Sequence, residues 1–489
     1  MAIIVTPEIK EIVKRYREIW TIRYSRSLLG WDMETYMPPA AFKERGEVNA
    51  VLESMVRRLI TNPEFSSLVE SAKPQNDVEK GIIRVLKRDL KYYTALPEEF
   101  LQEEERVKTE AFTIWREAKE KGNFSLFAPL LEKIVDLQRR KAEYLGYKDH
   151  PYDALLDLYE EGLTVRKCEH IFSTISKISH LFEKIKEKYP EKHPLEGMEY
   201  NRRFLERLIE YILFTMGFDF SRGRIDVSPH PFTTNMGLYD VRITTRYEGR
   251  DFRRALMAAI HEFGHAMYEM NIDKELWATP VQQGVSLGIH ESQSRFWENI
   301  VGRSSHFIDA FYKEMVVALP FLKDYGKDDL YTYLTLVRPE FIRVEADEVQ
   351  YVLHIYLRYK IEKELIEGSL EVKEAPQTWD DLMEDLIGVR PPNDKLGILQ
   401  DIHWAHATIG YFPTYAIGSM VAAHIYREIK GIAEGVKRAD FGSIMNILRE
   451  KIHRWGSVYS PEELLERAAG KKLDPENFIA YLEMKYLRF

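Results

Sequence analysis

The sequence predicts a mainly α-helical protein with a small β-sheet. Apolar residues recur at helical spacing along most of the chain, and one stretch, residues 222–248, breaks that pattern. Hydrophobic residues make up 45% and aromatic residues 12% of the 489 residues, which is enough for a large core. Because no flexible linker divides the chain, we expect a single helical unit over residues 1–489.

The helical segments can be placed in order along the chain. Thr6 is a suitable N-cap residue for the first helix, and Pro7 occupies the first helical position. Helical spacing then predicts helices over residues 40–61, 77–93, 97–121, 127–144, 165–188, 200–216, 344–367, 414–434 and 439–453. Ser460-Pro461-Glu462-Glu463 forms a capping box before another helix, and Asp474-Pro475 opens the last one.

The segment 222–248 has the features of strands. It contains Pro229 and Pro231, and residues 239–247 alternate apolar and polar side chains with several β-branched residues. We expect a strand there, within a small sheet. A free edge of this strand could pair with an extended peptide, and a structural hairpin without substrate contact is the alternative.

Residues 251–270 predict the most informative helix. Ala, Leu, Met and Arg are strong helix formers, Asp251 can cap the start, and no proline interrupts the segment. Gly264 costs a helix about 1 kcal/mol relative to Ala. A glycine at this position suits the close approach of another segment.

This helix carries the run His261-Glu262-Phe263-Gly264-His265. Positions i and i+4 share one helix face about 6 Å apart, so both imidazoles can reach one cation, and zinc prefers such nitrogen ligands. Glu262 lies about 100° around the helix from His261 and can face a metal-bound water without binding the metal. The pattern predicts zinc-dependent hydrolysis of peptide bonds.

A third protein ligand is expected from a later segment, because catalytic zinc usually has three protein ligands and a water. Residues 288–299 have helical character, and Glu291 and Glu298 lie seven residues apart on one face. Spacing alone permits either carboxylate, and His290 is a third option. Ordinary salt-bridged surface carboxylates are the alternative.

Taken together, these motifs resemble the carboxypeptidase Taq family of thermostable zinc metallocarboxypeptidases. The run at 261–265 is followed by His-Glu-Ser-Gln at 290–293, and further family motifs stand in order at 230–232 (His-Pro-Phe), 240–244 (Asp-x-Arg-x-Thr), 342–347 (Ile-Arg-x-x-Ala-Asp) and 397–404 (Gly-x-x-Gln-Asp-x-His-Trp). The family sequence is also similar to this one at residues 31–35, Trp-Asp-Met-Glu-Thr. The catalytic motifs would thus occupy residues 230–415.

The resemblance implies the third ligand, the fold and the activity. Glu291 would join His261 and His265 around one zinc ion per subunit, and cobalt could replace the zinc. The fold would be a neurolysin-like helical body with two lobes flanking a deep groove. The implied protein is a homodimer that releases single C-terminal amino acids from peptides with broad specificity.

Roles for further residues follow from the chemistry of such a site. Glu262 is expected to act as general base, and Tyr415 is favoured as the donor to the oxyanion by analogy with related helical zinc peptidases, with Tyr411 second. Either tyrosine could instead belong to the core. Arg343 is the leading receptor for the substrate carboxylate, since arginine offers a bidentate fork. Arg242 is the second candidate.

For Arg242 we prefer another role, an ion pair with Asp401 that closes one end of the groove. An ordinary surface ion pair is the alternative for Arg242 and Arg343 alike. His403 and His230 are candidate substrate-binding residues, and His406 is a weaker one. Each histidine could instead orient a neighbour or lie in the core.

Composition bounds the partners and the location. The 78 acidic and 69 basic side chains give a net charge of −9, which argues against nucleic acid as a partner. Cys168 is the only cysteine, which fits a reducing cytoplasm. No signal peptide or long apolar run is apparent, so we expect a cytoplasmic protein without membrane contact. The 30% of charged residues is compatible with a thermophilic source.

Two alternative functions remain from the sequence. An oligoendopeptidase or dipeptidase could use the same zinc scaffold, and it would cut a C-terminally amidated peptide that a carboxypeptidase spares. A helical binding protein with a vestigial metal site is the alternative from a different class. Retention of all four residues of the metal site argues against it.

Overall fold

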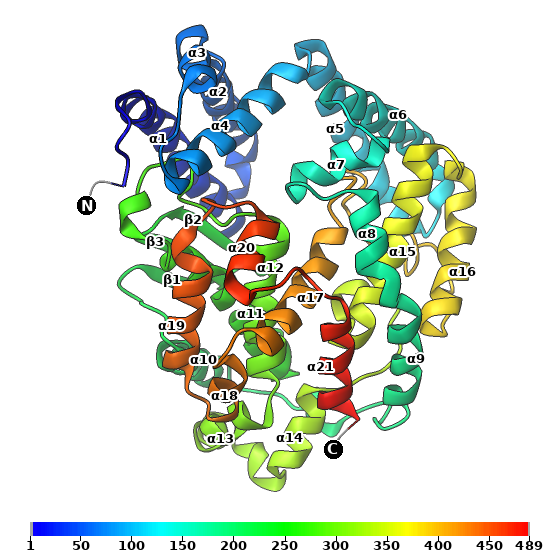
Figure 1. The fold of residues 1–489 in the computed structure, drawn as a ribbon. Helices are drawn as coiled ribbons and strands as arrows, with labels where there is room; N and C mark the ends of the chain where they lie inside the picture. The colour runs from blue at the N-terminus through cyan, green and yellow to red at the C-terminus, as the bar shows by residue number, and fades with distance from the viewer. Residues whose placement is uncertain (1–2, 488–489) are drawn as a thin grey trace.

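The structure, a computed structural model, describes residues 3–487 and consists of α-helices around one small sheet (Figure 1). This confirms the predicted mainly α class. Within the described residues, no helix has the length and apolar character needed to cross a membrane. One apolar cluster extends through the chain from Ile9 to Tyr486.

The first part of the chain forms ten helices, α1 (Pro7–Thr35), α2 (Phe42–Ile60), α3 (Pro63–Ser71), α4 (Asp77–Ala95), α5 (Glu98–Lys121), α6 (Ala128–Leu145), α7 (Pro151–Tyr159), α8 (Val165–Ile171), α9 (Ile175–Lys186) and α10 (Arg202–Met216). After the sheet come α11 (Phe252–Met270), α12 (Leu287–Arg295), α13 (Ser305–Ala318), α14 (Lys327–Leu334), α15 (Glu348–Glu367), α16 (Ala375–Ile387), α17 (Pro413–Glu428), α18 (Ile432–Lys437), α19 (Phe441–Lys451), α20 (Pro461–Ala469) and α21 (Glu476–Tyr486). Every predicted helical range contains a helix, and the ranges 165–188 and 414–434 are each divided into two.

Three helix starts lie where predicted, but their caps differ. Thr6 precedes α1 without capping it, because its hydroxyl and backbone N–H both donate to the buried carboxylate of Glu79, at 2.7 Å each. Ser460 makes no side-chain cap bond to α20. Asp251 precedes α11 with φ of 51° and makes no cap bond either, and it instead accepts a hydrogen bond from the hydroxyl of Tyr333. At Thr6 and Asp251, tertiary partners take the place of the local cap.

The sheet has three strands in the order β1 (Gly223–Val227), β3 (Asp240–Thr245), β2 (Thr233–Gly237). Strand β3 runs parallel to β1 and antiparallel to β2. The predicted strand at 239–247 is therefore confirmed as β3. Because β3 is the central strand and both of its edges are paired, a free strand edge beside the metal helix can come only from the outer strands β1 and β2.

Three helices at the centre of the molecule position the histidines and carboxylates of the motifs. Helix α12 packs against both α11 and α17, and α11 also packs against β2 and β3 of the sheet (Figure 1). A Cβ atom on Gly264 would lie 2.5 Å from Cα of Ser294, and one on Gly418 would lie 2.6 Å from Cβ of Glu291. Since those distances are too short for real carbon atoms, glycine is required at both crossings. The predicted close approach at Gly264 is confirmed.

Candidate metal centre

Helices α11 and α12 bring together three groups that can bind one metal ion. One ligand atom each from His261, His265 and Glu291 lie within 4.8 Å of one another. Oε2 of Glu291 is 3.5 Å from Nε2 of His261 and 3.4 Å from Nε2 of His265. Two imidazole nitrogens and one carboxylate oxygen, all facing one point, form a donor set that fits a catalytic zinc ion.

The other two candidates for the third ligand stand directly behind the histidines. Oε2 of Glu298 lies 2.9 Å from Nδ1 of His261, and Nδ1 of His290 lies 2.6 Å from Nδ1 of His265. After α12 the helix widens into a π-helical turn, Phe296–Gly302, which contains Glu298. Glu298 and His290 therefore contact the two candidate histidine ligands from the Nδ1 side, away from the point that the two Nε2 atoms and Glu291 face.

Burial and neighbouring charges set the ionisation of this cluster. Burial opposes ionisation of Glu291, but Arg295 and the two histidines hold its pKa well below the usual range. Nε of Arg295 donates to Glu291 at 2.7 Å. Although burial works against it, Glu291 and Glu298 raise the pKa of His261 to about 10. A cation must therefore displace a proton from His261 in order to bind.

Glu262 lies beside the ligands and faces strand β2. Its Oε2 accepts a hydrogen bond from Oγ1 of Thr233 at 2.6 Å, and Thr233 is the first residue of β2. Only 6% of Glu262 is exposed, and burial raises the pKa of its carboxyl. A buried carboxylate with a raised pKa is suited to taking up and releasing a proton.

Arg343 lies in a buried cluster of charged and aromatic side chains. Its Nε and Nη2 donate to Oδ1 of Asp401 at 3.0 and 2.8 Å, and its Nη1 donates to the hydroxyl of Tyr351 at 2.9 Å. Nε of Arg358 donates to the other oxygen of Asp401 at 2.6 Å. Despite burial, the two arginines hold the pKa of Asp401 far below its usual range. Asp401 is thus fully occupied by two buried arginines.

The predicted ion pair between Arg242 and Asp401 is wrong. Arg242 donates from Nε and Nη2 to Asp240, at 2.8 Å each, and its guanidinium lies 4.3 Å from the centre of the Trp31 ring. Residues two apart on a strand share one face, so Asp240 on β3 offers a local bidentate partner. Arg242 is held on the sheet by Asp240 and Trp31, the latter from the family-like segment of α1.

The two candidate tyrosines lie next to Arg343 and His403. The ring centres of Tyr411 and Tyr415 are 5.2 Å apart, and the hydroxyl of Tyr415 is 3.4 Å from Nε2 of His403. The guanidinium of Arg343 lies 5.0 Å from the Tyr415 ring. Burial lowers the pKa of His403 to about 4, so this ring is neutral. His230, in contrast, is exposed on the segment between β1 and β2.

Sequence reasoning missed several polar partners of the site. Arg295 lies four residues after Glu291, and Glu269 lies four residues after His265, so helical spacing could have identified both. Thr233 and Tyr351 come from other parts of the chain, and no local pattern points to them.

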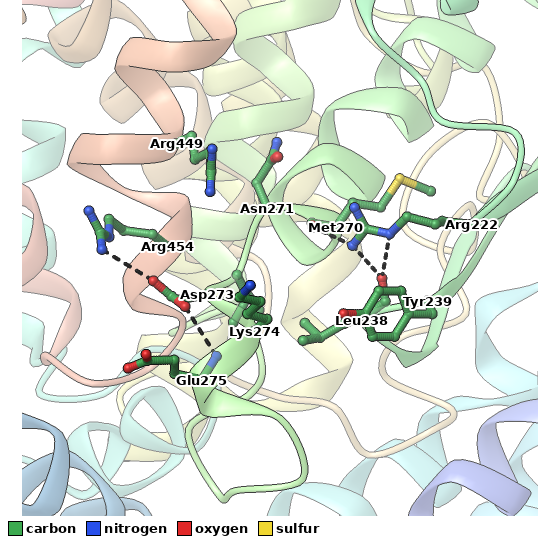
Figure 2. A pocket seen from close by; sticks show the side chains of 11 residues that line it. Arg222, Leu238, Tyr239, Met270, Asn271, Asp273, Lys274, Glu275, Arg449 and Arg454 are labelled. Atoms are coloured by element: carbon green, nitrogen blue, oxygen red, sulfur yellow. Dashed lines mark hydrogen bonds and ion pairs between the residues drawn. The ribbon is translucent and has the colours of Figure 1, made fainter. Parts of the chain in front are cut away.

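A separate hollow of about 590 Å³ lies at the C-terminal end of α11. Figure 2 shows Arg222 donating to the carbonyls of Leu238 and Met270, and Arg454 paired with Asp273. None of the predicted site residues lines this hollow.

Comparisons with known proteins agree with the motifs. The family model of the carboxypeptidase Taq (M32) metallopeptidases matches residues 8–486. "Thermostable carboxypeptidase 1" of Pyrococcus furiosus is 49% identical over 98% of each chain, and "Carboxypeptidase 1" of Bacillus subtilis is 36% identical over 94% of each chain.

Solved structures agree as well. A Pyrococcus furiosus carboxypeptidase matches with a TM-score of 0.96 and 47% identity over 99% of this chain and 100% of that one. The M32 carboxypeptidase from Deinococcus radiodurans R1 matches with a TM-score of 0.95 and 31% identity over 98% and 99%. The resemblance seen in the sequence is confirmed, and the chain belongs to the carboxypeptidase Taq (M32) family of metallopeptidases.

Proposed function

We propose that this protein is a zinc-dependent metallocarboxypeptidase that releases single C-terminal amino acids from peptides. The observation that carries the proposal is the convergence of one ligand atom each from His261, His265 and Glu291 within 4.8 Å, beside the buried Glu262. His261, His265 and Glu291 would hold the zinc ion, which would supply an activated water and polarise the scissile carbonyl. The relatives named as carboxypeptidases support the same activity.

Glu262 is the general base of the proposed reaction. Its Oε2 is occupied by the hydroxyl of Thr233, which leaves Oε1 to accept the proton of the attacking water. The same oxygen then delivers the proton to the leaving amine. The pKa raised by burial supports both steps, because a weakly basic carboxylate would hold the proton too briefly for the second.

Arg343 receives the free carboxylate of the substrate. A guanidinium has five N–H groups. Three of those in Arg343 donate to Asp401 and Tyr351, so one N–H on each Nη atom remains. Two neighbouring donors of this kind match the two oxygens of a carboxylate. The buried partners hold the fork in place before the substrate arrives.

The remaining residues have supporting roles in the proposal. Tyr415 donates to the oxyanion, with Tyr411 as the second candidate, and both phenols lie in the cluster that contains Arg343 and His403. Asp401 contributes by fixing Arg343. His403 binds the substrate near Tyr415, while Arg242 and His230 are substrate contacts supported only by their family motifs.

Further properties belong to the same proposal. They are broad side-chain specificity, replacement of zinc by cobalt, a neurolysin-like groove between two lobes, a homodimer, a cytoplasmic location and thermostability. The relatives named thermostable support the last of these.

The proposal is tested with a peptide and its C-terminal amide. We expect release of one amino acid at a time from the free peptide, with chelation abolishing it and zinc restoring it, and no cleavage of the amide. Cleavage of the amide within the chain would indicate an oligoendopeptidase instead. Stoichiometric zinc without any hydrolysis would indicate a binding protein.

A further inference from the structure

A chain of three side chains runs from the metal-binding face of α11 into the interior. Nδ1 of His265 lies 2.6 Å from Nδ1 of His290, and Nε2 of His290 lies 2.8 Å from Oε1 of Glu269. All three groups belong to α11 and α12, the two helices that carry the candidate ligands. We name this series the Glu269–His290–His265 relay.

Only one arrangement of protons satisfies the relay when Nε2 of His265 faces the metal. Nδ1 of His265 then carries the proton, and Nδ1 of His290 accepts it as a hydrogen bond. Nε2 of His290 must carry the other proton and donate it to Glu269. In this arrangement the carboxyl group of Glu269 is the last acceptor of the series.

The second ligand histidine has a different partner. His261 faces the carboxylate of Glu298 directly, and Glu298 is paired with Arg303 at 2.8 Å. Arg295 also lies 3.5 Å from Glu298. Arg303 and Arg295 therefore balance the negative charge of Glu298, which lies in direct contact with His261.

Glu269 lacks such balance. It is 4% exposed, and its carboxylate accepts from Nε2 of His290, from the backbone N–H of Gly284 at 3.0 Å and from Nδ2 of Asn235. Across residues 3–487, no lysine or arginine pairs with Glu269. A buried carboxylate without a countercharge is costly, so this charge needs a cation to which it can couple.

We propose that Glu269 and His290 are positioning residues that orient His265 and couple the charge of Glu269 to the bound metal. This inference rests on the proposed metal site at His261, His265 and Glu291. The relay fixes the ring of His265 with Nε2 toward the metal, and it makes that nitrogen a stronger donor. Since Asn235 lies on β2, the relay also ties this strand to the metal site.

The main test measures zinc affinity by competition with a chelating dye. Glu269→Gln keeps the shape of the side chain and its acceptor for His290 but removes the charge. We expect its Kd for zinc to rise about 10- to 100-fold, as is usual when such partners of a ligand are removed. Glu79→Gln is the matched control, because Glu79 is also buried and accepts hydrogen bonds from neutral donors, the backbone N–H groups of Val5 and Thr6 and the hydroxyl of Thr6, but it lies on α4.

The outcomes separate the relay from the proposed function. An unchanged Kd in Glu269→Gln, beside a wild type that binds one zinc tightly, overturns the relay and leaves the metal site standing. A rise of the same size in Glu79→Gln also overturns it, since the effect would then come from general destabilisation. A wild-type chain that binds no zinc overturns both proposals.

A spectroscopic measurement tests the hydrogen bond itself. In the cobalt-loaded protein, the Nδ1 protons of the two ligand histidines give strongly shifted, exchangeable proton resonances. We expect His290→Phe to lose the His265 resonance through rapid exchange while the His261 resonance stays. His290→Asn should restore it, because the amide oxygen can occupy the place of Nδ1 as acceptor. Two slowly exchanging resonances in His290→Phe would overturn the relay.

Discussion

Arg343 and Asp401 are joined by two hydrogen bonds to a single carboxylate oxygen, at 3.0 and 2.8 Å. Nε of Arg358 donates to the second oxygen at 2.6 Å. The single negative charge of Asp401 therefore faces two positive charges, those of Arg343 and Arg358. One positive charge therefore remains in a buried cluster. A substrate carboxylate would neutralise it, as the role proposed for Arg343 requires.

Removing the fork should weaken recognition of the substrate carboxylate. We predict that Arg343→Ala lowers kcat/KM on free-carboxylate peptides about 100-fold, which corresponds to about 3 kcal/mol for a buried charged hydrogen-bond pair. Zinc content should not change, because Arg343 contacts none of the three ligands. Arg390→Ala is the control, since Arg390 is an exposed arginine paired with Asp381 and Glu384. Unchanged kcat/KM in Arg343→Ala would remove it from this role.

Replacing the general base should stop turnover without releasing the metal. We predict that Glu262→Gln lowers kcat about 10²- to 10⁴-fold while one zinc per chain is retained. Thr233→Val removes only the hydroxyl that donates to Oε2 and should lower kcat by a smaller factor. Steady-state kinetics and metal analysis of the same samples check both. Full activity of Glu262→Gln would refute the assigned mechanism.

Metal removal should lower thermal stability. The buried carboxylate of Glu291 lies beside both candidate ligand histidines, and a cation there compensates a charge that is otherwise costly to bury. At a zinc concentration 1,000 times Kd, linkage predicts about 4 kcal/mol of stabilisation. Thermal unfolding with zinc and with chelator measures the difference in Tm. Identical Tm values for the two samples would show that no ion binds the folded state.

The carboxyl of Glu160 should make stability depend on pH. Burial raises its pKa to about 7, and it accepts from Oγ of Ser286 at 2.8 Å and from the backbone N–H of Gly288 at 2.7 Å. Because the folded pKa lies above the unfolded value of about 4.5, the folded state prefers the protonated form. The stability from this group is fully present below about pH 4.5 and is lost as pH rises toward about 7.

Glu160→Gln tests this dependence. The amide can donate to Ser286 and accept from Gly288, so it keeps both contacts without ionising. We predict that the variant gains stability relative to the wild type between about pH 5 and pH 8. Denaturant unfolding across that interval, with zinc in excess, measures the difference. A difference that stays constant with pH would contradict the assignment.

Much of the metal site could be predicted because its parts are local. His261, Glu262 and His265 lie within two turns of one helix, and periodicity alone places them on neighbouring faces. The choice between Glu291 and Glu298 could not be made from spacing, because both are on the correct face. Both carboxylates reach a histidine, and the packing of α12 against α11 and α17 decides that Glu291 lies beside the two Nε2 atoms while Glu298 contacts Nδ1 of His261.

Several of the incorrect expectations concern partners that are distant in the sequence. Thr6 was a reasonable cap, but the Thr6 hydroxyl has a stronger, charged acceptor in the carboxylate of Glu79. Arg242 was expected to pair across the groove, but Asp240 is two residues away and already on the same face of the strand. The central position of β3 depends on a parallel pairing with β1, which alternation of side chains cannot reveal.

The helices α3, α7, α13, α14 and α16 show a further limit, since sequence periodicity did not single them out. Both α3 and α7 have only nine residues, too few for a distinct helical pattern. Tertiary contacts, rather than local preference, stabilise helices of this length.

Gly264 and Gly418 allow the helices that carry the candidate ligands to pack at very short distances. At Gly264 the main chains of α11 and α12 meet directly, and at Gly418 the main chain of α17 lies against Cβ and Cγ of Glu291. A hydrogen-bonded backbone has no rotamers to exchange, so heating cannot loosen the α11–α12 crossing through side-chain disorder. Backbone packing therefore sets the distances between the imidazoles and the carboxylate, and we expect these distances to persist at high temperature.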